Sequence, residues 1–247
     1  MVPAMIITGQ ALMPVQRRTT MDTIVVSVGG SILIQNKDDI TFLRKLAKVL
    51  IGQSTKHRLF VVTGGGRMAR EYIRIGRELG ASESYLDELG IEVTRLNARL
   101  LITAIGDRCY HVPARTIEEA IHAGKSHPIV VMGGLHPGFT TDAVSAMIAE
   151  RVGASRLVNA TAVQGVFTSD PKKDPKAKLI PKMTYDELIA TVDRSEHAAG
   201  PNVIFDPLAA RIVKRAKIET VVCNGRNLKV LMNAIEGEEV VGTVIKG

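Results

Sequence analysis

The sequence predicts an α/β protein with an open, mainly parallel sheet in an α/β/α sandwich. Two observations support this fold class. Short apolar runs alternate along the chain with longer runs of helical periodicity, and three of the apolar runs lead directly into glycines. Strands that alternate with helices form parallel sheets whose two faces the helices cover. With 247 residues, the chain is long enough to bury a substantial core.

Six strands are expected from the apolar runs. They are Thr23–Val28, Leu59–Thr63, Pro128–Met132, Arg156–Ala162, Glu219–Cys223 and, at an edge of the sheet, Val240–Ile245. Helical periodicity fills the intervals between them. It is clearest at Asp39–Leu50, Arg70–Leu79 and Val93–Ile105. A further helix begins at Asp206 and Pro207, an N-cap followed by proline at the first helical position, and runs to about Lys217.

Two segments interrupt this alternation. Ser82–Gly90 is interpreted as a loop between helices, and Gly165–Lys182, which is rich in lysine and proline, as an exposed excursion from the sheet. Residues 1–20 begin apolar, but Gly9, Gln10 and Pro14 break the run and its positive charges come after it. This order is wrong for a signal peptide, and the run is too short to cross a membrane. We therefore expect a flexible extension over 1–20 and one domain over 21–247.

The composition excludes several classes of protein. The net charge is +7, but the basic residues are spread along the chain and only 4% of residues are aromatic. Such a chain is a poor nucleic-acid binder and suits small polyanionic substrates better. Cys109 and Cys223 form no metal or redox motif, which is typical of a reducing compartment, the cytoplasm. Because the six histidines lack ligand spacing, we expect no metal site built from protein residues alone.

Three glycine loops carry the functional signal. They are Ile24–Ser31 (IVVSVGGS), Leu59–Arg70 (LFVVTGGGRMAR) and Val131–Ser145 (VMGGLHPGFTTDAVS), and each runs from a strand through glycines into a helix. Backbone N–H groups at a helix start bind anions, most often phosphate. Three such loops at one edge of one sheet therefore indicate a protein that holds two phosphorylated molecules.

The glycine loops also have alternative interpretations. Gly64–Ala69 (GGGRMA) fits GxGxxA, but the acidic residue of a dinucleotide-binding unit should end the next strand. Glu83 and Asp87 fall in an expected loop instead, which disfavours NAD, and no GxxxxGK[ST] motif is present. The first glycine pair also suits a simple tight turn. Ser31, which adds a hydroxyl donor beside the freed N–H groups, favours phosphate.

Three side chains near the loops are candidates for the chemistry. Arg70 lies one helical turn beyond Gly66, within reach of a phosphate held by the glycine N–H groups. Asp142 suits either a carboxylate that stabilises its own helix start or one that steers Mg²⁺ or a substrate hydroxyl. His136 shapes its loop in our interpretation, because phosphoryl transfer to a phosphate needs little proton removal.

Taken together, these residues resemble the archaeal-type uridylate (UMP) kinases of the amino-acid kinase superfamily. The resemblance runs from about Thr23 to Ile245. It rests on VGGS (28–31), VVTGGGRMAREYI (61–73), SYLDELGIEVTRLNA (84–98), MGGLHPGFTTDAV (132–144), GVFTSDPKKDP (165–175) and DPLAARI (206–212). It implies a cytoplasmic homohexamer that transfers the γ-phosphoryl group of ATP to UMP with Mg²⁺. It implies neither a nucleic-acid nor a membrane partner.

The resemblance also implies roles for individual residues. The N-terminal part of the domain would bind the acceptor and the C-terminal part ATP. Arg70 and Asp142 would be catalytic. ATP would contact Gly30, Ser31, Gly66, Arg70, Thr161, Phe167 and Asp170. UMP would contact Gly65, Asp87, Leu135, His136, Pro137, Gly138, Phe139, Thr140 and Thr141, with Asp87 accepting from the ribose hydroxyls.

The chain departs from this family pattern at a few positions. Ser27 stands where archaeal relatives often carry aspartate, and Leu135 replaces a customary threonine. Ala162, Gln164 and Phe167 change the expected adenine pocket. Two alternatives stay open for this reason: a kinase of the same superfamily with a carboxylate, carbamate or isopentenyl phosphate acceptor, and a nucleotide-binding storage or regulatory protein without turnover.

Overall fold

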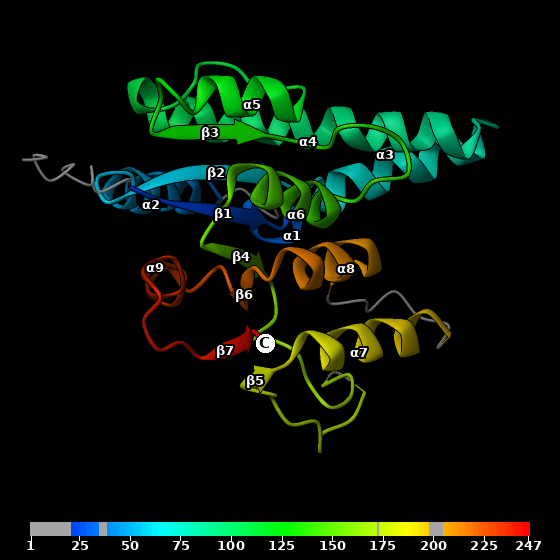
Figure 1. The fold of residues 1–247 in the computed structure, drawn as a ribbon. Coiled ribbons are helices and arrows are strands. Elements are labelled where there is room, and N and C mark those ends of the chain that lie inside the picture. The colour runs from blue at the N-terminus through cyan, green and yellow to red at the C-terminus, as the bar shows by residue number, and fades with distance from the viewer. Residues whose placement is uncertain (1–20, 35–38, 172, 198–204) are drawn as a thin grey trace, which may run out of the picture.

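The computed structural model describes residues 21–34, 39–171, 173–197 and 205–247. These form a seven-stranded sheet in the order β3-β2-β1-β4-β6-β7-β5 (Figure 1). The strands are β1 (Asp22–Val28), β2 (His57–Thr63), β3 (Ile129–Met132), β4 (Arg156–Thr161), β5 (Lys182–Met183), β6 (Glu219–Asn224) and β7 (Gly242–Ile245). The five strands from β3 to β6 are mutually parallel, whereas β7 runs antiparallel to β6 and parallel to β5.

Helices follow the strands in sequence. They are α1 (Gly30–Leu33), α2 (Asp39–Gln53), α3 (Gly66–Glu78), α4 (Glu83–Ile105), η1 (Gly106–Arg108), α5 (Ile117–Ala123), α6 (Thr141–Val152), α7 (Tyr185–His197), α8 (Pro207–Ala216) and α9 (Leu228–Glu236). Four of them, α5, α6, α7 and α8, pack on one face of the sheet with Val25, Phe60 and Leu157. On the other face, α1, α2, α4 and α9 pack on Val26 and Val61. The sheet is thus covered on both faces, as the α/β/α prediction required.

The prediction of a loop at Ser82–Gly90 was wrong, because this segment is the first two turns of α4. Ser82 caps the helix and accepts a hydrogen bond from the Tyr85 backbone N–H (3.4 Å). Burial of Leu86 then decides the conformation: a Cβ added at Gly76 of α3 would lie 2.7 Å from Leu86 Cδ2, so α3 and α4 approach closely at this glycine. Packing of this kind is not visible in local sequence.

The C-terminal edge of the sheet also differs from expectation. The strand predicted at Val240–Ile245 is β7, but it is an interior strand, and β5 lies outside it. The excursion expected at Gly165–Lys182 is tied to β7 by Thr243, whose hydroxyl accepts from the Val166 N–H (2.8 Å) and donates to the Ile180 carbonyl oxygen (2.6 Å). This buried hydroxyl holds the two ends of the excursion together.

Residues 1–20 lie outside the described residues, and so does the flexible extension expected there. Within the described part of the chain, no helix is both long enough and apolar enough to cross a bilayer.

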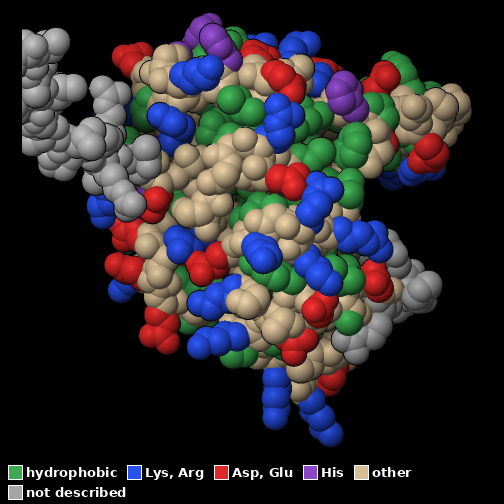
Figure 2. Space-filling model, in the orientation of Figure 1, with side chains coloured by type: hydrophobic (Ala, Val, Ile, Leu, Met, Phe, Trp, Pro, Cys, Tyr) green, Lys and Arg blue, Asp and Glu red, His purple; other side chains and the backbone are tan. Residues whose placement is uncertain are grey.

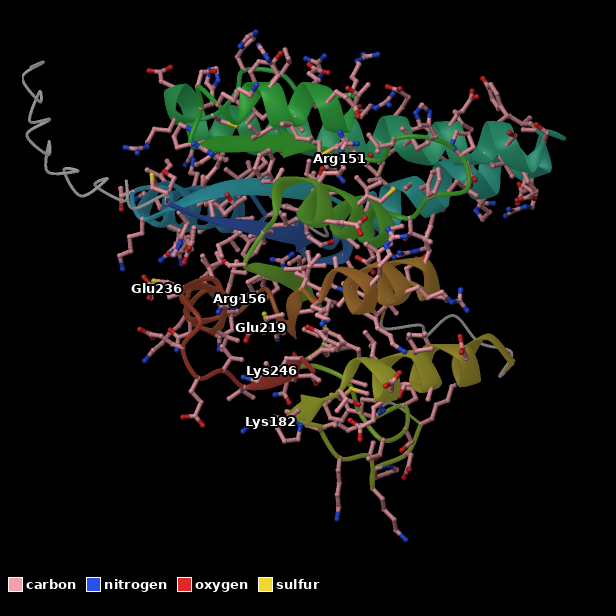
Figure 3. The ribbon with its side chains drawn as sticks, viewed as in Figure 1. Arg151, Arg156, Lys182, Glu219, Glu236 and Lys246 are labelled. Atoms are coloured by element: carbon pink, nitrogen blue, oxygen red, sulfur yellow. The ribbon has the colours of Figure 1, made fainter. Side chains whose placement is uncertain are left out.

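Charged side chains gather at the amino ends of the parallel strands. Arg156 begins β4, and its Nε lies 2.7 Å from Oε1 of Glu219, which begins β6; Lys246 Nζ lies 3.8 Å from the other oxygen of Glu219. Figure 3 shows these three side chains together. On the face seen in Figure 2, basic and acidic side chains are otherwise interspersed. The opposite ends of the strands carry the glycine loops.

Candidate active site

The carboxyl ends of β1, β2 and β3 lie side by side, because these three strands are parallel neighbours. Each ends in one of the three glycine loops. All three loops therefore meet at one edge of the sheet, as predicted. The space-filling view is hollowed on the side toward which these strands run, below the projecting ends of α3 and α4 (Figures 1 and 2).

The first two loops touch backbone to backbone. The Gly64 N–H donates to the Val28 carbonyl oxygen (2.9 Å), and a Cβ added at Gly64 would lie 2.5 Å from the Gly30 nitrogen. A Cβ at Gly30 would overlap the backbone of Gly64, Gly65 and Gly66. Gly66 begins α3 with φ +66°, a conformation that side chains disfavour. Two glycine loops packed this closely, one of them at the start of α3, suit a polyphosphate, because backbone N–H groups at a helix start bind anions.

The third loop is held by α4. The Gly134 N–H donates to the Thr94 hydroxyl (2.7 Å), and the Arg95 guanidinium donates to the Leu135 carbonyl oxygen (3.3 Å). The Gly138 N–H donates to Oδ2 of Asp87 (2.9 Å). The structure thus brings Asp87 against the loop with which it was predicted to hold UMP. In this structure the partner of Asp87 is a backbone amide, and its contact with a ribose hydroxyl stays a prediction.

The end of the third loop forms the start of α6. Thr140 caps this helix by accepting from the Ala143 N–H (3.1 Å). His136 and Phe139 are exposed, and Gly138 takes φ +85°. The exposed side chains of this loop therefore lie beside the N-terminus of α6, where the helix dipole favours an anionic ligand.

Asp142 lies in the first turn of α6, where it meets polar groups from two strands and a second helix. The Ser27 hydroxyl on β1 donates to its Oδ1 (3.1 Å), and the buried Asn159 side chain on β4 is a second hydrogen-bonding neighbour. Burial, and to a smaller degree the nearby carboxylate of Asp206, raise the pKa of Asp142 to about 6, against the lowering effect of Ser27 and Asn159. Asp142 is therefore a carboxylate with a perturbed pKa beside the glycine loops, a feature typical of functional sites.

Comparison with known proteins identifies the family. The model of the amino acid kinase family matches residues 22–224. The chain belongs to the amino acid kinase family. It is 44% identical over 222 residues to a uridylate kinase of Methanobrevibacter smithii, covering 90% of this chain and 98% of that protein. It is 46% identical over 215 residues to a uridylate kinase of Methanothrix thermoacetophila, covering 87% and 95% of the two chains.

Solved structures of relatives agree with this amino acid kinase fold. A uridylate kinase from Archaeoglobus fulgidus superposes with a TM-score of 0.82 at 42% identity, covering 90% of this chain and 99% of that chain. A UMP kinase from Ureaplasma parvum superposes with a TM-score of 0.74 at 23% identity, covering 92% and 100%, and supports the fold alone.

The residues predicted for ATP fall into two groups in this amino acid kinase. Gly30, Ser31 and Gly66 line the two touching loops, and Thr161 ends β4 beside them, since a Cβ added at Gly29 would lie 3.8 Å from the Thr161 Cα. Phe167 and Asp170 belong to the segment between β4 and β5, which Figure 1 shows extending to the far side of the sheet from β3. The adenosine pocket predicted from these two residues stays a prediction.

Sequence reasoning missed four polar side chains of this amino acid kinase site. Thr94 and Asn97 on α4 and Asn159 on β4 are all buried, and Asp206 was identified only as the N-cap of α8. Polar residues within otherwise apolar runs are the signal that could have found the first three. Arg70, by contrast, was proposed from the sequence and is exposed on α3, one turn beyond Gly66.

Proposed function

We propose that this amino acid kinase is a UMP kinase, which transfers the γ-phosphoryl group of ATP to UMP and yields UDP and ADP. The observation that carries the proposal is the meeting of the three glycine loops beside Asp142, in a chain 43–46% identical to uridylate kinases. Such an edge accommodates two phosphorylated ligands whose phosphates face each other, and positioning with charge neutralisation supplies most of the catalysis of phosphoryl transfer.

The two nucleotides are assigned to the two ends of this edge. The ATP phosphates lie against Gly30, Ser31 and Gly66, with the adenosine toward Thr161, Phe167 and Asp170. UMP lies between Gly65, Asp87 and the third loop, whose residues Leu135, His136, Pro137, Gly138, Phe139, Thr140 and Thr141 contact it. Support comes from the loop contacts and from the Asp87–Gly138 hydrogen bond at 2.9 Å. The N-terminal part of the domain then binds the acceptor and the C-terminal part binds ATP.

Magnesium fits this site as a companion of ATP. Mg²⁺ binds through one or two carboxylates, water and substrate phosphates rather than through an all-protein cage. Among the described residues, no group of three or more acidic, His or Cys side chains is arranged to hold a metal, whereas the Asp206 carboxylate lies near enough to Asp142 to contribute to its raised pKa. These two carboxylates would hold the ion, which neutralises phosphate charge when bound.

Groups of the protein itself supply the remaining electrostatic stabilisation of the phosphates. The backbone N–H groups of the first two loops and the N-terminus of α6 are fixed dipoles aimed at the phosphates. Ser27 and Asn159 orient Asp142 through the contacts described above. Arg70 adds a planar cation on the ATP side. None of these groups needs to remove a proton, which agrees with the exposed, loop-shaping position of His136.

The decisive experiment measures ADP formation with a panel of acceptors under saturating MgATP. The panel contains UMP, CMP, AMP, GMP, a carboxylate, carbamate and isopentenyl phosphate. We expect UMP to give the highest kcat/KM. A faster reaction with a non-nucleotide acceptor would assign the chain to another kinase of the superfamily. Binding of ATP and UMP without turnover would instead indicate a storage or regulatory protein.

Replacing Asp87 with asparagine tests the acceptor side. The neutral amide is a weaker acceptor for both the Gly138 N–H and a ribose hydroxyl, so we expect the KM for UMP to rise about tenfold or more. The KM for ATP should stay near the wild-type value. Glu88→Gln, one residue further along the exposed surface of α4, is the matched control. Equal effects of both variants on UMP would contradict the assignment of Asp87.

Replacing Arg70 tests the donor side. We expect Arg70→Ala to lower kcat on the order of 10²-fold, and Arg70→Lys to retain more activity because it keeps the charge but loses the bidentate fork. Arg74, one turn further along α3, pairs with Glu71 and Glu78 and provides the control variant Arg74→Ala. Steady-state kinetics with thermal melts separate the outcomes, and an unchanged kcat with a raised KM for ATP would mean uniform binding only.

The assembly in this proposal is a cytoplasmic homohexamer without nucleic-acid or membrane partners. Support for self-association comes from an apolar surface on α3 and α4 that a monomer would leave in water. Its exposed side chains are Met68, Tyr72, Ile75, Leu79, Tyr85, Leu96 and Leu100. The hollow within it has a volume of about 480 Å³. The buried, unpaired thiols of Cys109 and Cys223 agree with a reducing compartment.

A further inference from the structure

The proposed function assigns a role to only one residue, Asp87, of the motif SYLDELGIEVTRLNA (84–98). In the structure this motif forms α4 from the second residue of the helix to well past its middle, and its side chains reach two of the three glycine loops. Thr94 and Asn97 are 7% and 5% exposed, on a helix face whose neighbours Ala98 and Leu101 belong to the apolar core. Polar groups in such a place destabilise a fold unless they are hydrogen-bonded, so the partners of these two side chains are informative.

Thr94 connects α4 to the third loop and to β2. Its hydroxyl donates to the Ile91 carbonyl oxygen (2.6 Å) and accepts from the Gly134 N–H (2.7 Å). Its backbone carbonyl accepts from the Thr63 hydroxyl (2.9 Å), at the strand end that precedes the second loop. A Cβ at Gly133 would lie 3.0 Å from the Thr94 carbonyl carbon. The third loop thus packs closely against α4, and the hydrogen bond to Thr94 holds the Gly134 amide in place.

Asn97 connects the same helix to the second loop, one turn later. Its Nδ2 donates to the Gly64 carbonyl oxygen (2.8 Å) and lies 3.4 Å from that of Gly65. Binding this carbonyl orients the peptide that leads into Gly66, where the ATP phosphates are assigned. One rigid helix turn therefore holds the donor loop through Asn97 and the acceptor loop through Thr94.

We propose that Thr94 and Asn97 are positioning residues, which align the donor and acceptor loops through α4 and thereby set the separation of the two reacting phosphates. The inference rests on the proposed function, because the alignment matters only if both loops hold nucleotides. Neither side chain touches a reacting atom. Their effect is on geometry, and misplacement of reacting groups by about 1 Å costs roughly 10²-fold in rate.

Thr94→Val tests the link to the acceptor loop. Valine has nearly the shape of threonine but leaves the buried Gly134 N–H without a partner. We expect kcat to fall about tenfold or more, with ATP binding measured by calorimetry changed less than about twofold, and Thr94→Ser to restore most of kcat. The control is Thr103→Val on the same helix, since the Thr103 hydroxyl is exposed and donates only to the Arg99 carbonyl oxygen (2.9 Å).

Amide hydrogen exchange supplies a readout that does not depend on activity. The peptide that contains Gly134 should exchange faster in Thr94→Val than in Thr103→Val or wild type, because its anchor is lost. Unchanged exchange, or faster exchange with kcat unchanged, would overturn the proposal. If the wild-type protein does not phosphorylate UMP, the proposed function fails, and the exchange comparison still decides whether Thr94 anchors the loop.

A second pair of variants tests the proposal even if the Thr94→Val protein does not fold. Asn97→Ala removes the amide that holds the second loop. Asn233→Ala on α9 removes a comparable bond to a carbonyl oxygen, that of Glu239 (3.2 Å), far along the chain from the glycine loops. We expect Asn97→Ala to lower kcat about tenfold and Asn233→Ala to leave kcat unchanged. Equal kcat in the two variants would overturn the role of Asn97.

Discussion

Asp142→Asn is expected to lower kcat about 10³-fold, the upper part of the range seen when one preorganised electrostatic group is lost from an active site. The carboxylate lies at the start of α6, between Ser27 and Asn159 and close to Asp206. Asparagine has the same shape and still accepts a hydrogen bond from Ser27, but it carries no charge toward Mg²⁺ or the phosphates. Steady-state kinetics with saturating UMP and MgATP measure the loss.

The pH dependence of this variant provides an independent check. Because the pKa of Asp142 is raised to about 6 in the ligand-free protein, wild-type kcat/KM should fall as the pH drops through 6 and the carboxylate becomes protonated. The asparagine variant should lack this acid limb. Asp186→Asn is the matched control, because Asp186 also lies in the first turn of a helix, α7, but is exposed. If the loss of activity at low pH persists in Asp142→Asn, it is caused by another titrating group.

The Asp142→Asn variant should be more stable than the wild type at neutral and higher pH, although it is less active. The pKa of Asp142 rises from 3.8 to about 6 on folding, so between these values the folded state binds more protons than the unfolded state. Stability therefore falls as the pH rises through this window, and above it the ionised carboxylate is a net cost. We expect Asp142→Asn to melt higher than wild type at pH 8 and to lose most of this advantage near pH 4. Melting curves at the two pH values measure the difference.

Gly66→Ala is expected to abolish activity, with kcat reduced about 10³-fold in any protein that folds. Two costs act together at this position. The backbone has φ +66°, which costs a side chain about 1–2 kcal/mol, and the new Cβ would lie 2.5 Å from the Gly30 carbonyl carbon. The two loops would have to separate, so the concavity assigned to the ATP phosphates would open.

Two control variants separate strain from overlap. Gly80 has φ +84° with open space around its Cβ position, so Gly80→Ala carries the conformational cost alone. Gly52, within α2, has neither a positive φ nor a close neighbour, so Gly52→Ala should be neutral or stabilising. Thermal melts and kinetics should rank Gly66→Ala as the most damaging and Gly52→Ala as the least. Similar kcat values for Gly66→Ala and Gly80→Ala would contradict close packing of the first two loops.

The elements that could be predicted from the sequence are those whose signals are local. β1 is a mainly apolar run that ends at a glycine pair, and the Asp206–Pro207 start of α8 is an N-cap followed by a proline, with the Asp206 carboxylate accepting from the Ala209 N–H (2.8 Å). The start of α4 has a local cap, Ser82, but Gly90 follows within the helix, and the helix depends on Leu86 packing against Gly76. β5, two residues long, exists only because β7 pairs with it.

The sequence by itself determined that three strands end in glycine loops, and the parallel order of those strands placed the loops at one edge. It also placed Asp142 at that edge, because Asp142 lies within the third loop motif, Val131–Ser145, whereas Asp87 was assigned to the acceptor side through the family resemblance. Only the tertiary structure decided their partners: Gly138 for Asp87, and Ser27 with Asn159 for Asp142. The reason is physical. A glycine loop or a cap is specified by neighbouring residues, whereas a hydrogen bond between residues 115 positions apart depends on how strands and helices pack.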